Sequence, residues 1–166
     1  MNDEITITGY APGAIGRVVE LHAHYYAEHW GFDAAFEAKV AAGLGEFFGR
    51  MNPAVDGFWL ARRGREPVGS VTIDGGDWRE EGARLRWFIV GEAARGRGVG
   101  KALMQEAMQF CRRAGHTRVY LWTFAGLDAA RRLYERHGFR LVEEHEGTEW
   151  GKPMREQRMV ADLATA

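Results

Sequence analysis

Three glycines and three basic residues alternate over a short stretch in the middle of the chain. The stretch follows an apolar segment at 84–90 and reads Arg95-Gly96-Arg97-Gly98-Val99-Gly100-Lys101. Glycine costs about 1 kcal/mol relative to Ala inside a helix, so helix propensity does not explain its use here. Glycine does let an anion approach the unpaired N–H groups and the positive dipole at a helix start. Because Arg and Lys add positive charge, the pattern predicts a site that binds a diphosphate.

The spacing excludes two common nucleotide-binding loops. A Walker-type loop needs Gly six positions before Lys101 and Ser or Thr after it, where this chain has Arg95 and Ala102. A dinucleotide-binding G-x-G-x-x-G motif that begins at Gly96 needs a sixth-position Gly, where this chain has Lys101. The anion site therefore belongs to another class.

The segments on either side of this turn have clear periodicities. Residues 84–90 are rich in Trp, Phe, Ile and Val, which favour a buried strand. Residues 99–114 place apolar side chains on one helical face, and Gly115 is suited to end that helix. The apolar run at 119–124 predicts a second buried strand. A strand–helix–strand unit of this length implies a parallel strand pair.

The same reasoning along the whole chain predicts an ordered set of elements. Helices are expected at about 14–30, after a cap at Asp33, at 99–114 and at 127–138. Strands are expected at 5–8, 56–62, 68–74, 84–90, 119–124, 139–145 and 157–163, the first and last of them at sheet edges.

Composition restricts the class of protein. The chain has 166 residues, 46% of them hydrophobic, which predicts a single domain over 1–166. A net charge of −1 gives no general attraction to nucleic acid or anionic membranes, and no apolar run is long enough to span a bilayer. The acidic start and the single Cys111, expected to be a buried thiol, favour a cytoplasmic protein.

Two motifs resemble hallmarks of the GNAT N-acetyltransferase superfamily. Arg95-x-x-Gly98-x-Gly100 directly after a strand resembles its acyl-CoA pyrophosphate turn. The segment at 130–139, in which Tyr134 precedes a Gly-Phe pair by four residues, resembles its second hallmark. The resemblance covers most of the chain, most firmly 56–145. It implies an α/β (α+β) fold with a mixed, mostly antiparallel seven-stranded sheet and four helices, in the order β-α-α-β-β-β-α-β-α-β-β.

The resemblance also implies where acetyl-CoA binds. The strands at 84–90 and 118–124 are expected to splay apart, so that the pantetheine arm pairs with the backbone of 88–90 while the turn at 95–101 holds the diphosphate. The predicted cofactor-binding residues are Phe88, Ile89, Val90, Arg95, Gly96, Arg97, Gly98, Val99, Gly100 and Lys101. A departure from the family pattern is Leu127, which stands where many relatives have Asn.

The implied reaction is transfer of an acetyl group from acetyl-CoA to a primary amine of an unidentified small molecule or peptide, by direct attack. Tyr134 is the predicted catalytic residue, because a phenol stays protonated at neutral pH and can protonate the leaving thiolate. The backbone N–H of Val90 is a candidate oxyanion donor. The strand at 84–90 carries no Asp or Glu, so the general base stays open among Asp74, Glu80, Glu81 and a histidine of the first helix, acting through water.

Several alternatives stay open at this point. A non-catalytic acyl-CoA-binding regulatory or sensor module would keep the turn without the chemistry. The first helix carries His22, His24 and His29, but His22 and His24 lie on opposite sides of a helix, so we expect no metal. One of these histidines is a candidate for the acceptor pocket. The loops at 28–34, 75–82 and 146–153 are expected to shape that pocket, with Trp30, Trp78 and Trp150 as aromatic walls. A monomer and a homodimer are equally compatible with the sequence.

Overall fold

The helices and strands follow the predicted order. The computed structural model describes residues 4–76 and 78–163 of the chain. Its elements are β1 (Ile5–Thr8), α1 (Ala14–Trp30), α2 (Ala34–Arg50), β2 (Gly57–Arg63), β3 (Glu66–Asp74), β4 (Ala83–Val90), a 3₁₀ turn η1 (Glu92–Ala94), α3 (Val99–Arg113), β5 (Arg118–Phe124), α4 (Asp128–Arg136), β6 (Arg140–Gly147) and β7 (Met154–Asp162). Among the described residues, no helix has the length and apolar character needed to cross a membrane.

Local chemistry sets the helix boundaries. The Asp33 side chain accepts a hydrogen bond from the Ala35 N–H at 3.0 Å, and this cap starts α2 as predicted. Helix α3 ends at Arg113, and Gly115, with a φ of 84°, turns the chain toward β5. The predicted start of α2 and the predicted bounds of α3 are therefore confirmed to within a residue or two.

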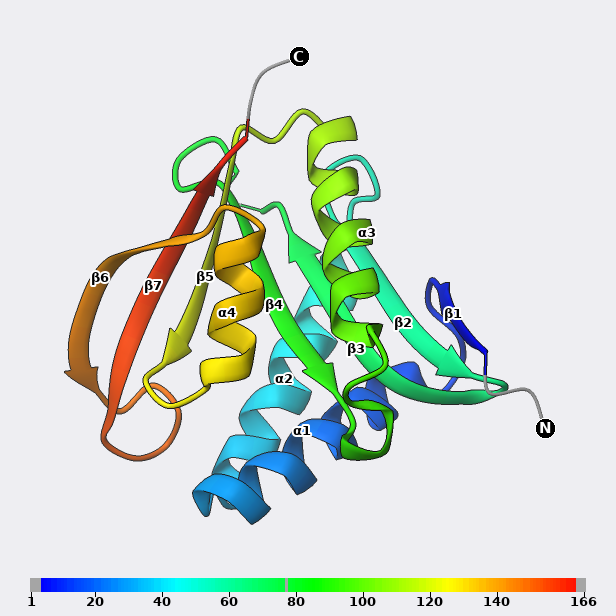
Figure 1. Ribbon diagram of the computed structural model, residues 1–166, viewed down its shortest axis with the longest axis vertical. Helices are drawn as coiled ribbons and strands as arrows, with labels where there is room; N and C mark the ends of the chain where they lie inside the picture. Colours follow the sequence, from blue (N-terminus) through cyan, green and yellow to red (C-terminus); the bar gives the residue numbers. More distant parts are fainter. Residues whose placement is uncertain (1–3, 77, 164–166) are drawn as a thin grey trace.

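All seven strands form one sheet in the order β1-β2-β3-β4-β5-β7-β6 (Figure 1). Neighbouring strands are antiparallel except β4 and β5, whose parallel pairing confirms the prediction. The prediction that the last strand lies at an edge is wrong, because β7 lies between β5 and β6. Strand β6 occupies the edge instead, with mostly exposed side chains, whereas most of β7 is buried.

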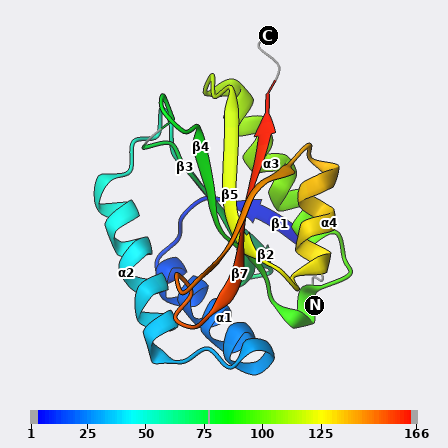
Figure 2. The ribbon, with the colours of Figure 1, turned by 90° about the vertical axis from the view of Figure 1, so that its left-hand side faces the viewer.

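Helices cover both faces of the sheet. Helices α1 and α2 lie on one face, and α3 and α4 lie on the other (Figure 2). Each pair has its own apolar cluster, one built around Phe36, Leu44, Phe47 and Phe124 and the other around Leu103, Met104, Met108 and Leu121.

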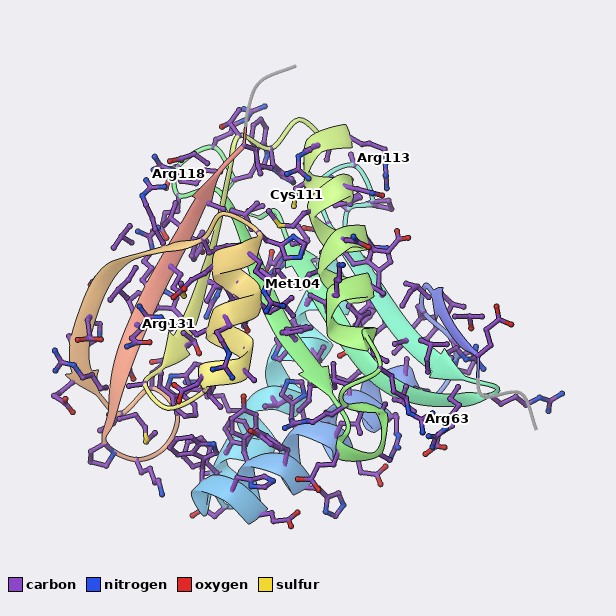
Figure 3. The ribbon with its side chains drawn as sticks, viewed as in Figure 1. Arg63, Met104, Cys111, Arg113, Arg118 and Arg131 are labelled. Carbon is purple, nitrogen blue, oxygen red and sulfur yellow. The ribbon has the colours of Figure 1, made fainter. Side chains whose placement is uncertain are left out.

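Met104 and Cys111, labelled in Figure 3, belong to the buried side of α3. Burial raises the pKa of the Cys111 thiol to about 12. The predicted buried thiol is therefore confirmed, and this thiol stays protonated at neutral pH.

Candidate active site

The central feature of the site is the separation of β4 from β5. The two strands pair only at Ala83 with Val119 and at Arg84 with Tyr120. Beyond these pairs they diverge, and their arrowheads lie well apart in Figure 1. A cleft of about 900 Å³ opens there, lined by β4, β5, α1, α2, α4 and the turn before α3. The expected splay of these strands is therefore present. Beyond Arg84, the edge of β4 that faces β5 has no strand partner among the described residues.

A bulge in β4 shapes the wall of this cleft. Ser70 of β3 pairs with Ile89 while Thr72 pairs with Arg86, so β4 contains one extra residue between these pairs. Trp87 has a φ of 47°, a left-handed conformation that costs a non-glycine residue about 1–3 kcal/mol. The Ser70 hydroxyl holds it by donating to the Trp87 carbonyl at 3.0 Å. Gly43 of α2 makes room for the Trp87 ring, since a Cβ there would lie 2.8 Å from it.

The glycine turn lies at one end of the cleft. Gly98 precedes α3 with a φ of 75°, and no side-chain hydrogen bond caps the helix start. A Cβ on Gly100 would lie 3.2 Å from both Phe88 and Leu133, so only glycine fits there without displacing the cleft wall. Gly96, Gly98, Val99 and Gly100 all line the cleft. This backbone presents the unpaired N–H groups of a helix start, as the anion-binding prediction requires.

Of the three basic residues in the turn, only Arg95 lines the cleft. Its Nε donates to the Val90 carbonyl at 3.1 Å, and its guanidinium stacks over the Tyr25 ring at 4.3 Å. Arg97 and Lys101 are exposed and lie outside the cleft lining. Their charge acts on an anion at the turn through solvent, where attraction is weak and screened by salt. Sequence reasoning could not predict the contact between Arg95 and Tyr25, because it joins two distant segments.

The predicted catalytic residue lies inside the cleft. Tyr134 of α4 is buried, and its ring contacts Phe88 and Phe139 at centroid distances of 5.9 and 6.0 Å. Burial raises the pKa of Tyr134 above its usual value, and nearby Tyr26 adds to the rise. The phenol is therefore protonated at every pH at which the protein is expected to work. Phe88, Ile89 and Val90 line the same cleft, so the structure brings these three residues and Tyr134 together.

The structure argues against the three carboxylates among the candidates for the general base. Asp74 is buried, which raises its pKa, but hydrogen bonds from Arg50, Gly76 and Arg86 outweigh burial and hold the pKa below its usual value. Glu80 and Glu81 are exposed and do not line the cleft. These three carboxylates are therefore poorly placed to take a proton from a bound amine.

His22 is the histidine of α1 that lines the cleft. Its Nδ1 bonds the Val18 carbonyl at 2.8 Å, and because a carbonyl only accepts, Nδ1 carries the proton. Burial lowers the pKa of His22 to about 4 despite that bond. At neutral pH the ring is therefore uncharged, and Nε2 offers a lone pair. Sequence reasoning did not distinguish it from His24 and His29, because burial decides between them.

The far end of the cleft is built from side chains of distant segments. Trp122 of β5, Trp150 of the β6–β7 loop and Phe36 of α2 form an aromatic wall. Lys39 pairs with Glu149 at 2.7 Å, and His145 contacts Glu156 at 3.0 Å. Of the predicted pocket tryptophans, only Trp150 lines the cleft. Trp30 covers Gly126 and packs on Phe124, and Trp78 packs on His116 away from the cleft.

Within the described part of the chain, one group of three side chains has the spacing of a metal site. Glu28, His29 and Glu92 place their ligand atoms within 4.8 Å of one another. All three are exposed, and His29 already bonds Glu92. None of them lines the cleft, so this surface group does not belong to the candidate active site.

Comparison with known proteins agrees with this architecture. An uncharacterized N-acetyltransferase of Methanocaldococcus jannaschii is 30% identical over 128 residues, which are 74% of this chain and 56% of that protein. This chain thus spans a little over half the length of that curated relative.

Solved structures resemble the fold over nearly the whole chain. A GNAT acetyltransferase of Staphylococcus aureus Mu50 has a TM-score of 0.76 and 17% identity, covering 97% of this chain and 100% of that one. The structure of yncA from Salmonella typhimurium, solved with its cofactor acetyl-CoA, has a TM-score of 0.74 and 17% identity, covering 97% of this chain and 95% of that one. Residues 16–139 match the acetyltransferase (GNAT) family, and since this is well over half of the sequence, the chain belongs to that family.

Proposed function

We propose that this protein is an acetyl-CoA-dependent N-acetyltransferase that acetylates a primary amine by direct attack. One observation carries the proposal: the cleft between β4 and β5 has an uncapped helix start at one end and the buried Tyr134 inside it. Acetyl-CoA has a diphosphate for the first feature and a thioester for the second. The relative named as an N-acetyltransferase supports the same reaction.

Different cleft residues bind different parts of acetyl-CoA. The backbone of 96–100 and the Arg95 guanidinium hold the diphosphate, because an uncapped helix start combined with a cation favours anions. The free edge of β4 at 88–90 offers backbone groups to the amides of the pantetheine arm, as an added strand would use them. The Val90 carbonyl accepts a hydrogen bond from Arg95. This bond connects the strand edge proposed for pantetheine to the turn proposed for the diphosphate.

Tyr134 supplies the proton for the departing sulfur. Its raised pKa keeps the phenol protonated, and the same burial that raises it also makes a nearby thiolate a stronger base. The backbone N–H of Val90 is our candidate donor to the tetrahedral oxyanion. His22 keeps a neutral ring in the cleft wall, so its Nε2 accepts a hydrogen bond from the amine, directly or through water. Its low pKa makes it an orienting group, so the proton that the amine loses passes to solvent, and the Tyr134 phenolate is reprotonated from solvent.

Release of free thiol from acetyl-CoA in the presence of a panel of primary amines tests this function. We expect thiol release that depends on both substrates, with acetylated amine appearing in equal amount by mass spectrometry. Calorimetric titration with acetyl-CoA should show one site per chain. A protein that binds acetyl-CoA but acetylates no amine in a broad panel would be a regulatory or sensor module instead.

A further inference from the structure

Arg84 occupies the closed end of the cleft. It sits at the last pair that joins β4 to β5, opposite Tyr120, and on its other side it pairs with Asp74 of β3. A position in the middle of the sheet removes much of its guanidinium from water, and the side chain is half-buried. Burial lowers the pKa of Arg84, and the neighbouring charge of Arg86 lowers it further. A full positive charge is thus held in a wall of the cleft, in an environment that disfavours it.

The carboxylates near Arg84 are already engaged by other cations. Asp74 and Glu149 are the two whose charges favour the protonated form of Arg84. Asp74 accepts two hydrogen bonds from Arg50, at 3.1 and 2.8 Å, one from Arg86 at 3.0 Å and one from the Gly76 N–H at 3.1 Å. Four bonds use the whole acceptor capacity of a carboxylate. Glu149 is paired with Lys39 at 2.7 Å.

Among the described residues, Arg84 consequently has no ion-pair partner of its own. Its Nε is a buried donor that meets no acceptor in the part of the chain that the structure describes, and no carboxylate there forms an ion pair with it. A buried donor without a partner costs about 1–3 kcal/mol, and buried cations in proteins are normally paired. Since the side chain borders the cleft, a bound anion can supply the missing acceptors.

The surroundings indicate what kind of anion this is. The glycine turn that suits the diphosphate begins at residue 95, after β4 has ended, whereas Arg84 lies near the start of that strand. Trp122 and Trp150 border the same cleft, so the anion belongs to a molecule that also has apolar parts. A planar guanidinium fork donates to two oxygens of one anionic group, and a carboxylate is the common group of this geometry on small amines.

We propose that Arg84 binds a carboxylate on the acceptor, so that the substrates are amino acids or other amines that carry a carboxylate. This inference rests on the proposed N-acetyltransferase function and narrows it. The observation behind it is a buried Arg84 Nε that has no acceptor among the described residues, beside a saturated Asp74 and a Glu149 that is already paired with Lys39. The pairing with substrate satisfies the buried Nε and places the acceptor on the aromatic wall.

The test uses matched acceptors that differ only in the carboxylate. Thiol release is measured with a panel of free amino acids and with the corresponding amino acid amides, for the wild type, Arg84→Gln and Arg84→Lys. Arg158→Gln is the control, because Arg158 lies on the neighbouring strand β7 opposite Trp122 but outside the cleft lining. Comparing variant with wild type on each acceptor cancels the different basicities of the two kinds of amine.

For the preferred free amino acids, we expect Arg84→Gln to lower kcat/KM by roughly 10- to 100-fold, mainly through KM, as for a lost charge-assisted hydrogen bond. With the amides, the two proteins should differ by less than about 3-fold, because no ion pair is lost. Arg84→Lys should fall between the wild type and Arg84→Gln, and Arg158→Gln should match the wild type. Equal losses on acids and amides, or an equal loss in Arg158→Gln, would overturn the proposal.

A binding measurement separates this inference from the proposed function. Trp122 and Trp150 border the cleft, so tryptophan fluorescence reports on binding of N-acetyl amino acids and their amides in the presence of CoA. Tighter binding of the acids, lost in Arg84→Gln, supports the carboxylate site even where no turnover is found. Turnover of amines with no preference for the acids in either assay would leave the N-acetyltransferase in place and remove the carboxylate site.

Discussion

The two ends of the cleft are built in opposite ways. At one end, residues 95–100 form a continuous turn whose backbone borders the cleft, and only Arg95 adds a charged side chain there. At the other end, side chains from four separate segments line the cleft, namely Arg84, Lys39, Trp122 and Trp150. On the proposed function, the first end recognises a diphosphate through backbone N–H groups, which a short motif can supply. The second end would recognise the acceptor by shape and charge, which only the complete fold assembles.

The comparison predicts that changes at the two ends affect different kinetic quantities, while a change between them affects the chemistry. Tyr134→Phe should have the largest effect, a fall in kcat of roughly 10²- to 10⁴-fold, the range for a lost general acid. Acetyl-CoA affinity, measured by calorimetry, should change little because the ring is kept. Tyr10→Phe is the matched control, since Tyr10 is 57% exposed. An unchanged kcat would remove Tyr134 from the mechanism.

Gly98→Val tests the backbone end. A left-handed φ costs a residue with a side chain about 1–2 kcal/mol, so the turn should rearrange and the Kd for acetyl-CoA should rise by roughly 5- to 30-fold. Gly64→Val is the control, because Gly64 also has a left-handed φ of 62° but lies in the β2–β3 turn. Both variants should lose similar stability. If Gly64→Val weakens acetyl-CoA binding equally, the effect reports on folding and not on the turn.

Trp150→Ala tests the side-chain end and should have a smaller effect. Loss of an aromatic wall should raise KM for the acceptor by roughly 3- to 10-fold and leave the Kd for acetyl-CoA unchanged. Trp78→Ala removes a tryptophan that packs on His116 outside the cleft, so it should leave both constants unchanged. Thermal melting of both variants checks that the fold is retained. A rise in the Kd for acetyl-CoA in Trp150→Ala would mean that the two ends are not independent.

The last prediction concerns stability and not a kinetic constant, and it involves a helix that lines the cleft. His22 has a folded pKa of about 4 against an ordinary 6.5, so the unfolded chain binds more protons between these values. The contribution of His22 to the free energy of unfolding is therefore complete above pH 6.5. It falls by up to about 3 kcal/mol as the pH drops toward 4. Urea unfolding of His22→Gln between pH 4 and 7 should lack this loss, whereas His24→Gln, on the exposed side of α1, should keep it. Equal pH profiles for wild type and His22→Gln would contradict the assignment.

Much of the fold and the glycine-turn end of the cleft could be predicted from the sequence because their signals are local. The helical stripe of 99–114, the Asp33 cap and the glycine turn each lie within a few residues. The interior position of β7 could not be read, because its Glu156 and Gln157 look like surface residues. In the fold they are buried and satisfied across the sheet, Gln157 by donating to Glu144 at 2.6 Å.

The features that escaped sequence reasoning at the site are all relations between distant segments. Nothing in the type of residue 87 indicates a left-handed bulge, since Trp is not a residue that favours it. The isolation of Arg84 follows from the saturation of Asp74 by Arg50 and Arg86, which only the folded chain brings together. Arg97 and Lys101 are predicted cofactor residues because they belong to the motif, and the fold exposes both of them outside the cleft lining.

The bulge at Trp87 links the chemistry of the cleft to a helix that precedes it by more than thirty residues. Gly43 of α2 leaves no space for even a methyl group beside the indole. A larger residue at 43 would push the indole and the strand edge that it holds, and a smaller residue at 87 would relieve the pressure. Across diverging relatives, these two positions should therefore change as a pair, and a graft of the cleft onto another scaffold should fail unless α2 is transferred with it.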